Sequence, residues 1–256
     1  MAKKIATAGW GLYPVVDASI RRAYYHRDLC NTAEHPVLAQ GNCRSYGDAC
    51  LYAQVVSTLP LKHLLDFDPQ RGLLRAEAGI TIEEIIRFAL PRGFFPPVTP
   101  GTKFTTLGGC IAADVHGKNH HADGSIAAFV QELDMVLADG SPLRCSRAEH
   151  PDLFWATLGG MGLTGIILRA QVQLKAIESS RCLVDTDRTP DLDSLMTLLA
   201  ETDHLYEYSV AWIDTLAKGR RMGRSVVTRG RFARFDELPE KRKADPLAYH
   251  GSIKVS

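Results

Sequence analysis

The spacing of apolar residues along the chain predicts several short strands. Within residues 165–176 apolar and polar positions alternate, with apolar residues at Leu168, Ala170, Val172 and Leu174. This period of two indicates a half-buried strand. Residues 64–79 and 130–145 are each predicted to form two strands joined by a turn, and Asp139-Gly140 is a strong hairpin signal. The short apolar run Val37 to Ala39 is predicted to be a strand that leads into a tight loop.

Helices are predicted at four places, from their start signals and from amphipathic spacing. Thr81 and Glu84 stand three positions apart, as in a capping box, where each side chain satisfies a backbone donor at the helix start. Residues 106–113 predict a helical turn, and residues 150–160 predict a short helix with proline in its first turn. Residues 191–205 are amphipathic and predict a longer helix.

The character of the chain changes near Ile177. Before this residue, predicted strands and helices alternate with glycine-rich loops; after it, the pattern indicates a helix followed by the strands EYSVAWIDTL and RSVVTRGRF. Antiparallel pairing is the simplest arrangement for these strands. We therefore expect an α+β protein with one domain over residues 1–177 and a partial second domain over residues 178–256.

Composition and charge exclude several classes of protein. The 256 residues carry a formal net charge of +1, with no basic stripe, so we expect no nucleic-acid partner. No apolar run is long enough to cross a bilayer, and the N-terminus does not resemble a signal peptide. The six cysteines are irregularly spaced and include no C-x-x-C pair. We expect reduced thiols in a cytoplasmic protein.

Three glycine-rich segments are the strongest candidates for chemistry: residues 41–48, 99–117 and 159–166. Glycine permits positive φ and a close approach of backbone to a ligand. Successive backbone N–H groups can then hold a phosphate or pyrophosphate, so three such loops favour a nucleotide-type cofactor. The letters G-x-G-x-x-G occur in the third segment, but they precede a strand instead of opening a helix. The sequence contains neither a P-loop motif nor the G-x-S-x-G elbow of an α/β-hydrolase.

A histidine cluster, His116, His120 and His121, ends the second segment. Histidine is the commonest metal ligand and the usual acid or base at neutral pH. The zinc motif H-E-x-x-H is absent, since Gly117, Lys118 and Asn119 separate the first two histidines. We therefore expect no metal site, and favour a polar loop beside a cofactor with His116 facing inward.

Taken in order, four strings of this sequence resemble one family. They are GNCRSYGD, TPGTKFTTLGGCIAADVHGKNHHADGS, LFWATLGGMGLTGIILRA and SVAWIDTL. The chain, from about residue 10 to about residue 245, is similar to flavoproteins of the vanillyl-alcohol oxidase / p-cresol methylhydroxylase type. Within that family, the polyprenylphosphoryl-ribose oxidases carry the most similar strings. The resemblance implies an FAD-binding domain of two subdomains, followed by the start of an antiparallel substrate domain.

The resemblance also implies which residues hold FAD. Residues 39–49 would wrap the pyrophosphate, and the second segment would line the diphosphate and the flavin ring. The implied cofactor-binding residues are Ala39, Gln40, Gly41, Asn42, Cys43, Arg44, Ser45, Tyr46, Gly47, Asp48, Ala49, Gly101, Thr106, Leu107, Gly108, Gly109, Ala113, Asp114, Val115, His116 and Ile166. Many relatives attach the flavin covalently through a histidine where this chain has Arg44, so we expect non-covalent FAD. Cys110 stands where a small residue is common, and we expect its thiol to pack as a small hydrophobe.

The implied reaction is the oxidation of a sugar secondary alcohol to a ketone. The resemblance points to the 2-hydroxyl of a polyprenylphosphoryl ribose, oxidised as the first half of an epimerisation to the arabinose form used in arabinan synthesis. The expected catalytic residues are His116, Lys118 and Tyr46. The implied partners are the polyprenyl-phosphate sugar, an NAD(P)H-dependent reductase and, through the lipid substrate, the membrane surface.

Two other interpretations stay open. One is a related sugar or aldonolactone oxidase or dehydrogenase. The other is a catalytically incomplete flavin-binding chain that needs a second polypeptide. Members of the family are considerably longer than these 256 residues. We therefore expect a chain that is C-terminally truncated or that is one piece of a split protein.

Overall fold

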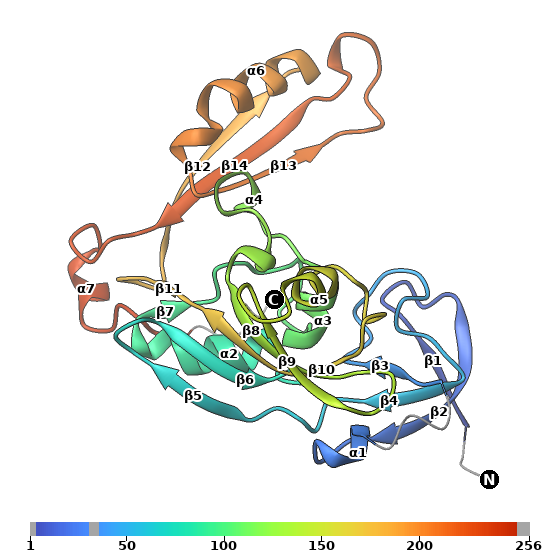
Figure 1. The fold of residues 1–256 in the computed structure, drawn as a ribbon. Helices are drawn as coiled ribbons and strands as arrows, with labels where there is room; N and C mark the ends of the chain where they lie inside the picture. The colour runs from blue at the N-terminus through green and yellow to red at the C-terminus, as the bar shows by residue number, and fades with distance from the viewer. Residues whose placement is uncertain (1–3, 31–35, 250–256) are drawn as a thin grey trace.

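Two β-rich bodies make up the computed structural model, which describes residues 4–30 and 36–249 (Figure 1). The larger body contains two main sheets and a two-stranded pair, and a smaller sheet projects from it. The strands of the first sheet lie in the order β1 (Lys4–Ala8), β2 (Val15–Arg22), β4 (Gln54–Ser57) and β3 (Leu38–Gln40). β1 and β2 are antiparallel, whereas β4 runs parallel to both of its neighbours. The short helix α1 (Arg27–Cys30) follows β2.

The second sheet has five strands, and every neighbouring pair is antiparallel. Their order is β5 (Leu64–Asp68), β6 (Leu73–Glu77), β10 (Ile166–Gln173), β8 (Val130–Val136) and β9 (Pro142–Ser146). Helices α2 (Ile82–Ala89), α3 (Leu107–Ala112) and α5 (Pro151–Thr157) pack on one face of this sheet. Their buried side chains form one hydrophobic cluster with the strands, which is the main core.

Local sequence signals predicted these elements well. Thr81 caps α2, because its hydroxyl accepts from the Glu84 amide while the Glu84 carboxylate accepts from the Thr81 amide at 2.9 Å. The predicted hairpins appear as β5–β6 and β8–β9, and the alternating segment is β10 at the centre of the sheet. The mixed helices and mainly antiparallel sheets confirm the α+β class.

A second hydrophobic cluster joins the first sheet to the second. It contains Leu29 and Val56 from the first side, and Val136, Ile166 and Leu168 from the second. Because these side chains come from both sheets, the two sheets share a core and form one body.

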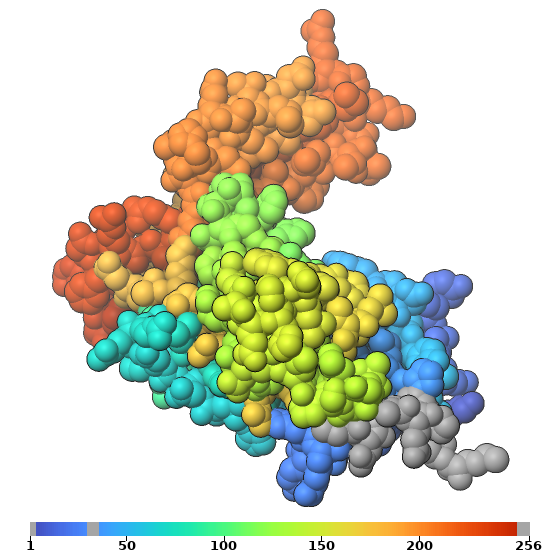
Figure 2. All heavy atoms as spheres, viewed as in Figure 1, coloured from blue at the N-terminus to red at the C-terminus, as the bar shows by residue number. Residues whose placement is uncertain are grey.

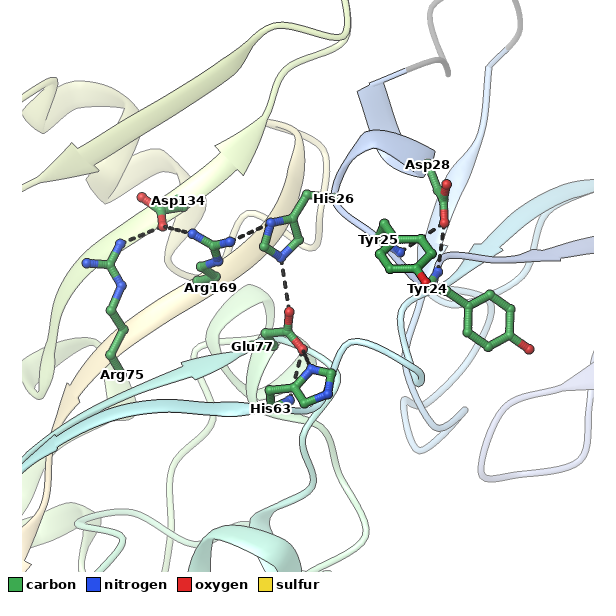
Figure 3. A network of polar contacts seen from close by, with 9 residues as sticks. All are labelled: Tyr24, Tyr25, His26, Asp28, His63, Arg75, Glu77, Asp134 and Arg169. Atoms are coloured by element: carbon green, nitrogen blue, oxygen red, sulfur yellow. Dashed lines mark hydrogen bonds and ion pairs between the residues drawn. The ribbon is translucent and has the colours of Figure 1, made fainter.

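A polar network lies beside this junction (Figure 3). His26, which directly precedes α1, lies 3.1 Å from the Glu77 carboxylate and 2.6 Å from the Arg169 guanidinium. The same Glu77 accepts from the amide and the ring of His63, at 2.9 Å and 2.7 Å. Arg169 also faces Asp134 at 3.7 Å. Buried Glu77 thus connects the first sheet to the second through charged hydrogen bonds.

The small sheet has the strand order β12 (Cys182–Thr189), β14 (Ser225–Phe232) and β13 (Tyr208–Ile213), all antiparallel. Helix α6 (Leu192–Thr202) packs on one of its faces through Leu195. The chain enters this sheet beside the point where it leaves, because the Ala233 amide donates to the Arg181 carbonyl at 2.8 Å. The boundary proposed near residue 177 stays a prediction.

After the small sheet the chain returns to the larger body. Short helix α7 (Glu240–Lys243) lies beside the two-stranded pair β7 (Phe94–Phe95) and β11 (Lys175–Ala176) (Figure 1). The Tyr249 hydroxyl then contacts Glu83 of α2 at 3.2 Å. No helix within the described ranges is long and apolar enough to cross a membrane.

Candidate functional site

The first glycine-rich segment forms a loop between β3 and β4. Its base is closed by Gln40, whose side-chain amide donates to the Cys50 carbonyl at 2.7 Å. Within the loop, Cys43 and Gly47 have positive φ, at 51° and 58°. The Trp10 amide donates to the Ser45 carbonyl at 3.0 Å, so the turn after β1 supports the loop from one side.

The second segment packs directly against this loop. A Cβ atom on Gly41 would stand 2.3 Å from the Thr106 hydroxyl oxygen, so only glycine permits the observed approach. The Asn42 side-chain amide donates to the Phe104 carbonyl at 2.8 Å. Thr106 is also the N-cap of α3, since its hydroxyl accepts from the Gly109 amide at 3.3 Å. One threonine therefore fixes both the loop contact and the helix start.

The third segment packs against the end of α3. The Gly159 amide donates to the Ile111 carbonyl at 3.1 Å, and the Met161 amide donates to the Ala112 carbonyl at 2.8 Å. These bonds satisfy carbonyl groups at the helix end. Asp114, just beyond it, has a positive φ of 40°. The three glycine-rich segments, widely separated in sequence, thus meet around α3.

Each segment also has a glycine that borders open space. No neighbouring atom lies within 4 Å of where a Cβ would stand on Gly47, Gly101 or Gly162. Gly47 and Gly162 have positive φ as well. Backbone that faces open space without a side chain is suited to the phosphates of a nucleotide-type cofactor, because its N–H groups can reach a ligand unhindered. The residues present therefore fit such a group.

The predicted cofactor-binding residues differ in how far the fold exposes them. Those open to solvent are Arg44, Tyr46, Gly47, Asp48, Gly101, Gly109, Ala113 and His116. Half-buried are Ala39, Gly41, Asn42, Cys43, Ser45, Ala49, Gly108, Asp114 and Val115. Buried are Gln40, Thr106, Leu107 and Ile166.

The buried members have structural contacts of their own. The Leu107 side chain belongs to the main core, and Ile166 begins β10 opposite Val136 with its side chain in the second cluster. Any contact of these two residues with a cofactor would come from their backbone.

Cysteine side chains support the loop and the helix. Cys110 is fully buried in the main core, as expected of a small hydrophobe, and burial raises the pKa of its thiol to about 11. Interaction between the Cys43 and Cys50 thiols across the loop raises the pKa of Cys43 and lowers the pKa of Cys50 to about 6. Arg44 lies over the Trp10 ring, 5.6 Å from its centroid.

The histidine segment continues from α3 and is held firmly. His116 forms a backbone bridge with Ser125, and its ring lies 5.4 Å from the His120 ring. Asn119 is fully buried and donates to the Pro97 carbonyl at 2.8 Å and to Asp123 at 2.7 Å. Within residues 4–30 and 36–249 no cluster of three or more His, Cys, Asp or Glu side chains could hold a metal ion.

His121, which sequence reasoning left without a role, connects this segment to the small sheet. Its Nε2 lies 2.9 Å from the Tyr206 carbonyl, which can only accept, so Nε2 donates. Its Nδ1 lies 3.9 Å from the Asp203 carboxylate. The Ser209 amide, at the start of β13, donates to the Lys118 carbonyl at 2.8 Å. The segment that carries His116 and Lys118 therefore contacts both bodies.

Sequence comparisons identify relatives of this chain. Residues 27–146 match the family model described as FAD binding domain. Over 217 residues, 83% of this chain, the sequence is 38% identical to decaprenylphosphoryl-β-D-ribose oxidase of Mycolicibacterium smegmatis, of which it covers 47%.

More distant relatives match over shorter stretches. The human Δ(24)-sterol reductase is 28% identical over 44% of this chain and 22% of its own length. Cytokinin dehydrogenase 6 of Oryza sativa subsp. japonica is 36% identical over 36% of this chain and 18% of its own length. The chain spans about half the length of the first curated relatives it matches.

Proposed function

Because residues 27–146 belong to the FAD binding domain family and FAD is the cofactor, we propose that the chain acts in an FAD-dependent oxidation of a sugar secondary alcohol. The observation that carries this proposal is that three glycine-rich segments meet around α3 and that each contains a glycine facing open space. Glycine loses more conformational entropy on folding than other residues do, so it is unfavourable unless a position needs it. At Gly47, Gly101 and Gly162 it leaves the backbone open to the approach of a ligand.

When bound, FAD would supply a two-electron acceptor for the substrate carbon. In the proposal, residues 39–49 and 101–116 hold it, with Ile166 contributing backbone. His116 is the candidate to hydrogen-bond the substrate hydroxyl or to tune the flavin. Tyr46, 81% exposed, can close against a bound ring. Since Arg44 stands where many relatives have the linking histidine, the proposal includes non-covalent attachment.

The proposed substrate is a polyprenylphosphoryl ribose, oxidised at its 2-hydroxyl as the first half of an epimerisation. Similarity to decaprenylphosphoryl-β-D-ribose oxidase supports this choice. The Lys118 side chain is exposed, and it forms no ion pair with any residue that the structure describes. A lysine in that state can bind a substrate phosphate. An NAD(P)H-dependent reductase and a membrane surface would be the partners.

A second candidate function is flavin binding without turnover by these residues alone. Residues 27–146 match the FAD binding domain model, whereas oxidation of the sugar is supported by similarity to a relative of which the chain covers 47%. A related sugar or aldonolactone oxidase is the remaining alternative, and it differs only in substrate.

The test begins with purified chain reconstituted with FAD. We expect a flavin absorbance spectrum, and acid precipitation should release all of the flavin because no covalent bond holds it. Under anaerobic conditions a prenylphosphoryl ribose should bleach the flavin band, whereas free alditols and aldonolactones should not. His116→Ala should retain the flavin and slow bleaching by about 10²-fold, with His120→Ala as the matched control.

The outcomes separate the candidates. Absence of flavin after reconstitution would exclude every version of the proposal. Bound flavin with no bleaching would favour flavin binding without turnover. Bleaching by alditols in preference to the prenylphosphoryl sugar would favour the alternative substrate.

A further inference from the structure

The connection between β13 and β14 projects from the far end of the small sheet, away from the glycine-rich segments (Figures 1 and 2). We call residues 214–224 the hairpin tip. Two of its apolar side chains are strongly exposed, Leu216 at 87% and Met222 at 59%. Exposed large apolar residues on a projecting turn indicate a contact surface when other features agree.

Charge is the second feature of the hairpin tip. Lys218, Arg220 and Arg221 are all exposed, and within the described part of the chain none of them forms an ion pair. The one acidic residue of the tip, Asp214, is already paired with Arg224 at 2.7 Å. The tip therefore presents three uncompensated positive charges on a chain whose formal net charge is only +1.

The hairpin tip is also held in shape by its own hydrogen bonds. The Asp214 carboxylate accepts from the amides of Leu216 and Ala217 at 3.0 Å and 3.1 Å. The Met222 carbonyl accepts from the Leu192 amide at 2.9 Å, which anchors the tip to the start of α6. A preformed surface loses little conformational entropy when it binds.

We propose that the hairpin tip docks on the surface of a bilayer that contains anionic lipid. Cationic side chains are attracted to anionic headgroups, and neighbouring leucine and methionine insert at the headgroup boundary. Nucleic acid would use the charges but not Leu216 and Met222, so a bilayer fits both features. The inference rests on the proposed function in one respect, because a polyprenyl substrate would lie in that bilayer.

The experiment is flotation of the full chain with vesicles. One set of vesicles is pure phosphatidylcholine, and the other contains about 30 mol% of the anionic lipid phosphatidylglycerol. Each basic side chain at such a surface contributes about fivefold to partitioning, so R220E/R221E should lower binding by about 30-fold or more. L216S/M222S should lower it by about tenfold.

The matched control is K241E/R242E on α7. It makes the same change in charge, at exposed residues of another basic run, and it should leave vesicle binding within about twofold. Circular dichroism and the flavin spectrum would verify that each variant folds. Equal loss in the control and the tip variants would overturn the proposal, because binding would then follow net charge alone.

Two other results would also overturn it: no preference for anionic vesicles, or binding to duplex DNA that depends on Arg220 and Arg221 without vesicle binding. The readout needs neither substrate nor turnover. Vesicle binding through the tip together with failure to oxidise a prenylphosphoryl ribose would therefore refute the proposed substrate and leave the docking surface in place.

Discussion

The contact between Gly41 and Thr106 gives the most direct test of how the candidate site is built. In Gly41→Ala the new Cβ would stand 2.3 Å from the Thr106 hydroxyl oxygen, 3.2 Å from its methyl group and 3.3 Å from its Cβ. Overpacking of this kind costs about 1–3 kcal/mol. Thr106→Ala removes the hydroxyl and methyl groups but also loses the cap of α3, at about 1 kcal/mol.

The double variant should therefore be less damaging than the sum of the two single changes. Once the hydroxyl and methyl are absent, only the 3.3 Å contact remains, and a shift of a few tenths of an ångström relieves it. We expect a favourable coupling of about 1–3 kcal/mol in the free energy of unfolding, and a parallel recovery of FAD affinity. Urea unfolding of the FAD-free chain and flavin fluorescence titration measure the two quantities.

Gly101→Ala is the matched control for this cycle. Its Cβ would meet no neighbouring atom within 4 Å, so the free energy of unfolding in the absence of FAD should be unchanged or slightly higher. FAD affinity should nevertheless fall, because the methyl group would enter the space assigned to the cofactor. Strict additivity at Gly41 and Thr106, or an unaltered FAD affinity in Gly101→Ala, would refute the assignment of these loops.

Three further predictions concern the framework around the site. Glu77→Gln should lower the free energy of unfolding by about 1–3 kcal/mol at pH 7. Burial would raise the pKa of Glu77, but hydrogen bonds from the His63 amide and ring outweigh it and hold the pKa below its usual 4.5. This stabilisation is complete above pH 4.5 and disappears as the pH falls through the lowered pKa. The urea midpoints of variant and wild type should therefore converge in acid, and a difference between the midpoints that stays constant with pH would contradict the reasoning. His121→Phe should accelerate hydrogen exchange in residues 206–209 about fivefold, whereas His121→Gln, which can still donate, should not; identical exchange in both variants would argue against the bridge. Gly108→Ala, whose Cβ would stand 2.8 Å from that of Ala78, should cost about 1–3 kcal/mol by thermal unfolding, and a neutral result would mean that the sheet and α3 can separate freely.

Features set by neighbouring residues could be predicted from the sequence. Three of these features depend on residues only a few positions apart. They are the capping box at Thr81, the turn at Asp139-Gly140 and the alternation of apolar and polar residues in β10. The glycine-rich segments were also recognisable, because their composition itself indicates unusual backbone. What the sequence pattern could not give was that these segments meet around α3.

Long-range pairing accounts for the elements that were missed. Strand β12 has a polar sequence with no clear alternation, and it is a strand because it pairs with β14 about 40 residues later. The role of His121 depends on a carbonyl 85 residues away. Likewise, Glu77 is buried between two histidines from different connecting segments, and nothing adjacent to it in sequence indicates this. Tertiary contacts of this kind leave no periodic signal.

The hydrogen bond between Arg181 and Ala233 has a consequence for how the small sheet can vary. Since the chain enters and leaves the small sheet at adjacent points, residues 182–232 form an insert whose ends already meet. An insert of this kind can be lengthened, exchanged or replaced by a short turn without moving either end of the host body. The small sheet, with its proposed docking surface, can therefore change independently of the larger body, which carries the glycine-rich segments proposed to bind FAD.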